Sequence, residues 1–176
     1  MISFRPIEIN DLIQLRNWRN SAEVLPYVRE YRLLNSSDQK TWFKSYLGQR
    51  RSADFDTELF IMSYKETETG CGGFTRIEWR NQKAELTFYI GETEFRKPLI
   101  IKELLLGLLE KGFNEWNFNK IYWPVFGHDP NLEIYAQVFI TESVMKDEYY
   151  WAGAFQDRHY LALTKKIYLQ KFNIRE

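Results

Sequence analysis

Residues 84–90 alternate between apolar and more polar side chains, and this pattern constrains the fold more than any other in the chain. Alanine, leucine, phenylalanine and isoleucine hold every second position, while glutamate, threonine and tyrosine lie between them. A period of two is typical of a β-strand that packs one face on a core. Residues 70–79 are rich in aromatic and β-branched side chains and precede a turn at residues 80–82, which predicts an antiparallel partner strand.

The segment after this hairpin has the composition of a largely buried helix. From Leu99 onward the apolar residues are too dense for a single surface stripe, although Lys102, Glu103, Glu110 and Lys111 still mark a side in contact with water. The start of this helix is aimed at whatever lies beyond residue 91. Free backbone N–H groups and the helix dipole converge there, so the place favours an anion.

Shorter patterns predict the remaining elements. We expect strands at residues 2–5, 58–64 and 120–126, helices at 11–20, 36–48 and 130–138, and a closing hairpin of 139–151 with 157–167. Asp11 is expected to cap the first helix, and the second helix is expected to bury Trp42, Phe43, and Tyr46 or Leu47. Pro124 removes one ladder donor, so its strand must be unpaired on one side at that residue. This order of elements predicts a three-layer arrangement around a mixed sheet.

The composition excludes several classes of protein. The 24 Lys and Arg residues balance the 24 Asp and Glu residues, so net charge gives no case for nucleic acid or for an anionic membrane. A single cysteine cannot form an internal disulfide and suits a reducing compartment. The apolar stretch at residues 99–109 is too short to span a bilayer, and the first residues do not resemble a secretion signal. We therefore expect one cytoplasmic domain covering residues 1–176.

The hairpin at residues 70–91 and the Arg-Asn-Trp-Arg-Asn sequence at residues 16–20 resemble the GNAT family of acetyl-CoA-dependent N-acetyltransferases. The similarity runs from Phe4 to about Leu163 and is greatest to branches that acetylate nucleotide-linked amino sugars or ribosomal-protein N-termini. It implies an α/β fold with α-β-α layers, in which a twisted, mostly antiparallel sheet is splayed between two parallel strands. Acetyl-CoA would be the co-substrate, and its pantetheine arm would fill the gap between those strands.

Acetyl transfer to an amine needs a deprotonated nucleophile, a hydrogen bond to the developing oxyanion and a proton donor for the leaving thiolate. Residues 128–140 are similar to a family motif, and the similarity implies that Tyr135 protonates the thiolate of coenzyme A. Glu85 matches a position where some members keep a glutamate and would be the general base, with Glu78 as its rival. Two structural alternatives stay open: Tyr135 as an ordinary core tyrosine, and Glu85 as a glutamate paired with Arg or Lys.

The resemblance also implies the donor-binding residues. These are Phe88, Tyr89, Ile90, Gly91, Arg96, Lys97, Pro98, Leu99, Ile100, Ile101, His128 and Asn131. The phosphate loop departs from the family pattern, because Leu99 and Ile101 occupy positions where glycines let the backbone approach a pyrophosphate. Pro98 deletes one more donor, so Arg96 and Lys97 would carry the interaction by charge.

For the acceptor, the resemblance implies contacts from Arg19 and Asn20 on the first helix and from Glu78 in the hairpin, although a solvated helix face explains the first two equally well. The acceptor would be a small-molecule amine. No metal site is expected, because His128 and His159 lie far apart in sequence and one cysteine supplies no zinc motif.

Three hypotheses follow. The first is an N-acetyltransferase that moves an acetyl group from acetyl-CoA to a primary amine, such as one on a nucleotide-linked amino sugar. The second is a GNAT-fold binding or interaction protein without acetyl transfer, supported by the missing phosphate-loop glycines. The third is a transferase with another acyl group or thioester carrier. A homodimer is compatible with each of them.

Overall fold

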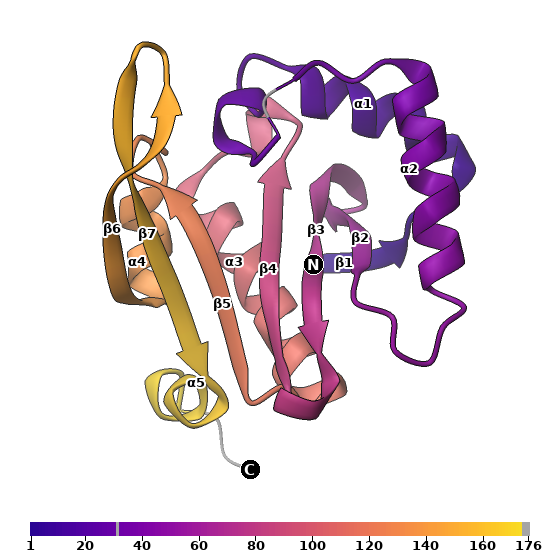
Figure 1. The fold of residues 1–176 in the computed structure, drawn as a ribbon. Helices are drawn as coiled ribbons and strands as arrows, with labels where there is room; N and C mark the ends of the chain where they lie inside the picture. The colour runs from indigo at the N-terminus through magenta and orange to yellow at the C-terminus, as the bar shows by residue number, and fades with distance from the viewer. Residues whose placement is uncertain (31, 174–176) are drawn as a thin grey trace.

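In the computed structural model, which describes residues 1–30 and 32–173, seven strands form one mixed sheet (Figure 1). The strands are β1 (Ile2–Pro6), β2 (Glu58–Tyr64), β3 (Thr67–Glu78), β4 (Lys83–Ile90), β5 (Lys120–Phe126), β6 (Ile140–Trp151) and β7 (Ala154–Thr164). Their spatial order is β1-β2-β3-β4-β5-β7-β6. The β4–β5 pair is parallel and the other neighbouring pairs are antiparallel, which confirms the predicted fold class.

Helices cover both faces of this sheet (Figure 1). They are α1 (Leu12–Asn20), α2 (Ser36–Gln49), α3 (Pro98–Glu110), α4 (Leu132–Val138) and α5 (Lys165–Lys171). The apolar sides of α1 and α2 pack with buried residues of β2 and β3 in one core cluster. Helices α3 and α4 share a second, larger cluster with the opposite face of the sheet, and Tyr168 of α5 joins it by stacking on Phe113.

Strand β4 follows the predicted alternation. Its apolar positions Ala84, Leu86, Phe88 and Ile90 are all buried in the cluster that contains α3. Helix α3 is apolar on most of its surface because it packs against the sheet and against α4, and its Leu104, Leu105 and Leu108 are completely buried. Burial of this kind stabilises a domain by about 25 cal/mol per Å² of apolar surface removed from water. The face that carries Glu85, Thr87 and Tyr89 looks toward α1 and α2.

Strands β4 and β5 separate soon after they start. Their parallel pairing covers Lys83 to Glu85 against Lys120 to Tyr122 and then stops. Beyond Glu85, strand β4 keeps its ladder with β3, while β5 stays paired with β7 through Phe126. The predicted parallel neighbours that diverge toward their C-terminal ends are therefore confirmed, and Pro124 lies in the diverging part of β5.

The end of β4 is fixed against α1 by a close contact. A Cβ atom at Gly91 would lie 2.1 Å from Cγ of Trp18, so glycine is required for the ring to lie on the backbone. The same ring donates a hydrogen bond from Nε1 to Oε1 of Glu92 at 2.8 Å. The chain direction at the end of β4 and the position of α1 are thus set together.

Four expectations about local structure are wrong. Residues 165–167 begin α5 rather than ending a strand, because Thr164 accepts a hydrogen bond from the N–H of Ile167 and caps the helix. Asp11 does not cap α1 with its side chain; its carboxylate binds Arg5 instead. Helix α4 begins at Leu132 rather than at residue 130. Trp42 is not a core residue, since 36% of its surface is exposed.

Candidate active site

A cavity of about 390 Å³ occupies the gap where β4 and β5 diverge, and we call it the splay cavity. It is lined by Phe88, Tyr89 and Ile90 of β4, Trp123, Pro124 and Val125 of β5, Arg96, Ile101, Asp129, Pro130, Asn131 and Tyr135, and residues 22–24, 27 and 28 of the loop after α1. One wall is the edge of β4 that has lost its ladder partner, so backbone N–H and C=O groups are available there. An extended ligand can bind such an edge by hydrogen bonding in place of a strand.

Tyr135 extends from α4 into this cavity and is 5% exposed. Its ring packs on Trp123 with centroids 4.5 Å apart. Burial raises the pKa of the Tyr135 hydroxyl well above its usual value, and the nearby Asp129 carboxylate raises it further. The hydroxyl therefore keeps its proton at neutral pH, as a proton donor must before it acts.

The start of α3 lies at the end of the splay cavity, and Arg96 also forms hydrogen bonds with the end of β4. Its Nε donates to the carbonyl of Ile90 at 3.0 Å, and its Nη2 donates to the carbonyl of Gly91 at 3.3 Å. Arg96 thus braces the end of β4 while still lining the cavity. Lys97 is exposed, and Leu99 is 64% exposed where the family has glycine.

The structure brings together about half of the predicted donor-binding residues. Phe88, Tyr89, Ile90, Arg96, Ile101 and Asn131 line the splay cavity, whereas Gly91, Lys97, Pro98, Leu99, Ile100 and His128 do not. His128 contacts the loop after α1 instead. Its Nε2 is 3.1 Å from the carbonyl oxygen of Pro26, and its ring packs between Tyr27 and Phe126.

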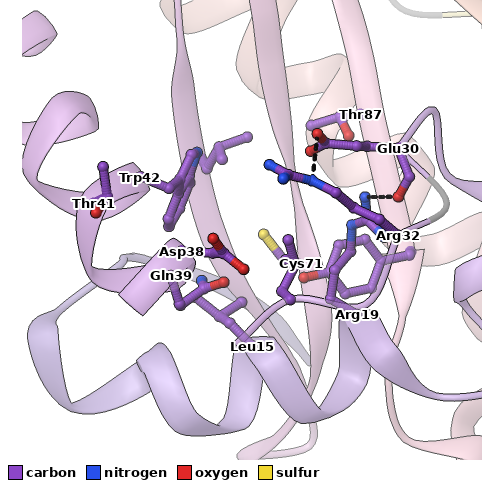
Figure 2. A pocket seen from close by; sticks show the side chains of 13 residues that line it. Leu15, Arg19, Glu30, Arg32, Asp38, Gln39, Thr41, Trp42, Cys71 and Thr87 are labelled. Atoms are coloured by element: carbon purple, nitrogen blue, oxygen red, sulfur yellow. Dashed lines mark hydrogen bonds and ion pairs between the residues drawn. The ribbon is translucent and has the colours of Figure 1, made fainter. Parts of the chain in front are cut away.

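A second cavity, of about 490 Å³, lies between the sheet and helices α1 and α2, and we call it the helix cavity (Figure 2). It is lined by Leu15 and Arg19 of α1, Glu30, Arg32 and Leu34 of the connecting loop, Asp38, Gln39, Thr41 and Trp42 of α2, and Leu59, Cys71, Thr87 and Tyr89 of the sheet. Trp42 forms one wall and stacks on Tyr46 with centroids 5.5 Å apart. Across the cavity, Nε of Arg32 donates to Oε1 of Glu30 at 2.9 Å.

The predicted acceptor residues separate into three locations. Arg19 lines the helix cavity, and its Nη2 donates to the carbonyl of Glu30 at 2.6 Å. Asn20 holds the loop closed instead, because its side chain donates to the carbonyl of Leu34 at 2.8 Å and accepts from its N–H at 2.9 Å. Glu78 lies in the β3–β4 turn, where it pairs with Lys83 at 3.0 Å and contacts neither cavity.

Glu85 lies on the α1–α2 face of β4 but lines neither cavity. Its side chain is buried and forms ion pairs with Arg29 of the loop and, at 3.2 Å, with Nη1 of Arg76. These contacts match the ion-pair alternative left open by the sequence. A role as general base remains a prediction, and an acceptor in the helix cavity would have to reach Glu85 past Thr87.

Several residues of the helix cavity carried no readable signal. Glu30 and Arg32 belong to an irregular loop. Its path is set by contacts of neighbouring loop residues with Asn20 and Glu85, which lie elsewhere in the sequence. Trp42 has helical spacing to Tyr46 that fits a core residue as well as a cavity wall. The polar run at residues 35–41 is the signal that would have placed Asp38 away from the apolar core.

Tyr89 connects the two cavities, since it lines both. Burial raises the pKa of the Tyr89 hydroxyl well above its usual value, and burial raises the pKa of the adjacent Cys71 thiol to about 12. Both groups are therefore neutral at physiological pH. The arrangement allows two ligands, one along β4 and one under α2, to meet at a single half-buried tyrosine.

Among residues 1–30 and 32–173, no group of three or more His, Cys, Asp or Glu side chains is placed to hold a metal ion. Within the same residues, no helix is long and apolar enough to cross a membrane.

Comparison with known proteins gives the same fold. The spermidine N-acetyltransferase of Vibrio cholerae, solved in complex with CoA and spermine, superimposes with a TM-score of 0.84 at 20% identity, over 96% of this chain and 98% of that one. A dodecameric structure of spermidine N-acetyltransferase from the same organism in an intermediate state gives a TM-score of 0.79 at 20% identity, over 97% of both chains. No curated protein matches the sequence significantly.

The sequence itself is similar to a known family. The model of the acetyltransferase (GNAT) domain matches residues 2–131, which include β1 to β5, helices α1 to α3 and both cavities' walls on β4. Because this match covers well over half of the chain, the protein belongs to the GNAT acetyltransferase family.

Proposed function

We propose that the protein transfers an acetyl group from acetyl-CoA, bound in the splay cavity, to a primary amine bound in the helix cavity. The observation that carries this proposal is that the two cavities share Tyr89. Two substrates held on either side of one residue are oriented for reaction at that residue, and such positioning supplies much of the rate acceleration in group transfer.

The splay cavity fits the thioester arm of acetyl-CoA. Its β4 edge offers backbone hydrogen-bonding groups that the ladder with β5 leaves unused after Glu85. Phe88, Ile101 and Trp123 give it apolar walls. The first turn of α3 exposes N–H groups at the same end, which suits the phosphates even without glycine at residues 99 and 101.

Tyr135 is placed to assist the departure of the thiolate. It lines the same cavity as the β4 edge and holds its proton at neutral pH. In the reaction, the amine nitrogen forms a bond to the acetyl carbon, the carbon–sulfur bond breaks, and the Tyr135 hydroxyl gives its proton to sulfur. The proton released from the new amide nitrogen restores the tyrosine through water.

The acceptor is argued from two sources. Solved structures of this fold include spermidine N-acetyltransferases, one of them in complex with CoA and spermine, so a linear polyamine is the first acceptor we propose. Glu30 and Asp38 could contact its ammonium groups, and the ring of Trp42 offers a cation–π surface. A nucleotide-linked amino sugar, which the sequence resemblance favoured, is the second candidate. Arg32 at the cavity edge would suit its phosphates.

The decisive experiment measures release of coenzyme A from acetyl-CoA with a panel of spermidine, putrescine and nucleotide-linked amino sugars, with mass spectrometry of the products. We expect a product heavier by one acetyl group on a primary amine. A thermal-shift assay with coenzyme A, acetyl-CoA and pantetheine provides the binding control. Stabilisation by none of them, together with no acetylated product, would instead support a binding protein without transferase activity.

The assembly state and the cellular location are also proposals. One solved relative is described as a dodecamer, and we infer that this chain also associates with copies of itself. Light scattering of the purified protein distinguishes a homodimer, with which the sequence is compatible, from a larger assembly. Fractionation of cells that make the protein tests the cytoplasmic location.

A further inference from the structure

Arg19 of the helix cavity forms no ion pair within the part of the chain that the structure describes. Its Nη2 donates to the backbone carbonyl of Glu30 at 2.6 Å. Its Nη1 is buried and has no hydrogen-bond partner in the described part of the chain. A buried donor of this kind costs free energy unless water or a ligand satisfies it.

This cation lies where the reaction would take place. Arg19 lines the helix cavity, and it interacts electrostatically with Tyr89, the residue shared with the splay cavity. Burial lowers the pKa of the Arg19 guanidinium, although an arginine stays protonated at any physiological pH. An amine that reaches the thioester past Tyr89 therefore approaches a fixed positive charge in a partly desolvated place.

In the described part of the chain, none of the other titratable groups around Arg19 forms an ion pair with it, although the Glu30 carboxylate attracts the guanidinium at longer range. These groups are Glu30 and Arg32 of the loop, Asp38 of α2, Cys71 of β3, Tyr89 of β4 and Tyr149 of β6. The Glu30 carboxylate is already paired with Arg32. The Asp38 carboxylate is used to cap α2, where its Oδ2 accepts from the N–H of Asn35 at 2.9 Å. Cys71 and Tyr89 are neutral.

On the basis of the function proposed above, we propose that Arg19 activates the acceptor amine by repelling its protonated form, so that the protein needs no general base at this position. A like charge a few ångströms away disfavours the charged state of an ionisable group. The same logic lowers the pKa of catalytic lysines that lie beside another cation. The proposal also agrees with the state of Glu85, whose carboxylate is held by Arg29 and Arg76.

The proton balance of the step is complete. The bound ammonium loses one proton to solvent, and the neutral amine attacks the acetyl carbon. The nitrogen–carbon bond forms, the carbon–sulfur bond breaks, and sulfur takes the proton of Tyr135. The second nitrogen proton then returns to Tyr135 through water, so the products are an acetamide, coenzyme A and one proton in solution.

The test compares Arg19→Gln with Arg19→Lys, using the full-length protein, acetyl-CoA and the best acceptor of the panel. The pH dependence of kcat at saturating acceptor reports the ionisation of the bound amine. For Arg19→Gln we expect the acidic limb of kcat to move up by about one pH unit or more. Below that limb kcat and KM should both fall about tenfold, because only the non-productive ammonium complex gains stability, while kcat/KM changes much less. Arg19→Lys keeps the charge and should keep the limb within a few tenths of a unit.

Other outcomes overturn the proposal. A limb that stays in place in Arg19→Gln, or a rise in KM with a fall in kcat in both variants, gives Arg19 only a structural role. If Arg19→Gln does not fold, the wild-type protein decides: its kcat limb must lie below the solution pKa of the acceptor, and must vanish with a weakly basic amine such as 2,2,2-trifluoroethylamine. A limb at the solution value contradicts the inference while leaving acetyl transfer intact. Absence of acetyl transfer to every amine overturns the proposed function as well.

Discussion

The two cavities are built in different ways. The splay cavity is formed by two strands that part, by helices α3 and α4 and by part of the loop after α1, and its main binding surface is the backbone of β4. The helix cavity is formed by side chains of α1, α2 and an irregular loop, and its character depends on Arg19, Glu30 and Trp42. The first is a property of the fold, and the second is a property of particular residues. The molecule therefore combines a proposed donor site that is set by the fold with a proposed acceptor site that is set by its own side chains. Mutations can test this difference.

The largest effect should come from the splay cavity. Tyr135→Phe removes the proposed proton donor and should lower kcat by roughly 10²-fold, while acetyl-CoA binding stays within a few fold of wild type. Tyr168→Phe is a matched control, because Tyr168 is 3% exposed but lies in α5, away from both cavities. Steady-state kinetics and calorimetry measure the two parameters. Equal turnover in the two variants would make Tyr135 a packing residue.

The contact that fixes α1 against the end of β4 can be disrupted at Gly91. In Gly91→Ala the new methyl group would meet the Trp18 ring at 2.1 Å, so α1 must move away from β4. We expect a loss of about 1–3 kcal/mol in the free energy of unfolding and a rise in KM for both substrates. Gly48→Ala is the control, since nothing lies within 4 Å of its added Cβ. Denaturant unfolding that shows equal stability for both variants would contradict the close contact.

Glu85→Gln tests what the acceptor side of the site requires. Loss of the ion pairs with Arg29 and Arg76 should loosen the loop that lines both cavities and raise the acceptor KM severalfold, corresponding to about 1 kcal/mol. The acidic limb of kcat should keep its position. Glu78→Gln, in the exposed turn, should change neither value. If the limb disappears in Glu85→Gln alone, Glu85 is the general base after all.

The smallest effect is expected at the start of α3. Lys97 is exposed and outside the splay cavity, so Lys97→Ala should weaken coenzyme A binding by only about 0.3–1 kcal/mol. Added salt should reduce the difference, because the charge is screened in solvent. Lys44→Ala on α2 controls for the loss of one surface charge. Calorimetry at two salt concentrations measures both, and a loss of more than tenfold at Lys97 would show a direct phosphate contact.

The sequence was most informative where a pattern has a local cause. The alternation in residues 84–90 and the density of apolar residues after Leu99 gave the central strand and helix, and Tyr135 was placed by a motif at the start and end of α4. The helix cavity could not be predicted, because long-range contacts such as Asn20 with Leu34 set the loop path. The helical spacing of Trp42 and Tyr46 fits a residue buried in the core as well as a residue that lines a cavity, so the sequence could not decide between them. The boundary between β7 and α5 could not be predicted either, because it depends on the hydrogen bond that Thr164 accepts from the N–H of Ile167.

The short pairing of β4 with β5 has a mechanical consequence. Since the parallel ladder ends after Glu85, the sheet consists of two half-sheets joined along a short seam, with β1 to β4 on one side and β5 to β7 on the other. The buried leucines of α3 belong to one core cluster with residues from both half-sheets and so connect them. Separating the two half-sheets at this seam therefore breaks few backbone hydrogen bonds, whereas a displacement of α3 affects the packing of both half-sheets. A ligand that binds in the gap and contacts both strands would therefore stiffen a junction that the backbone hydrogen bonds alone leave flexible.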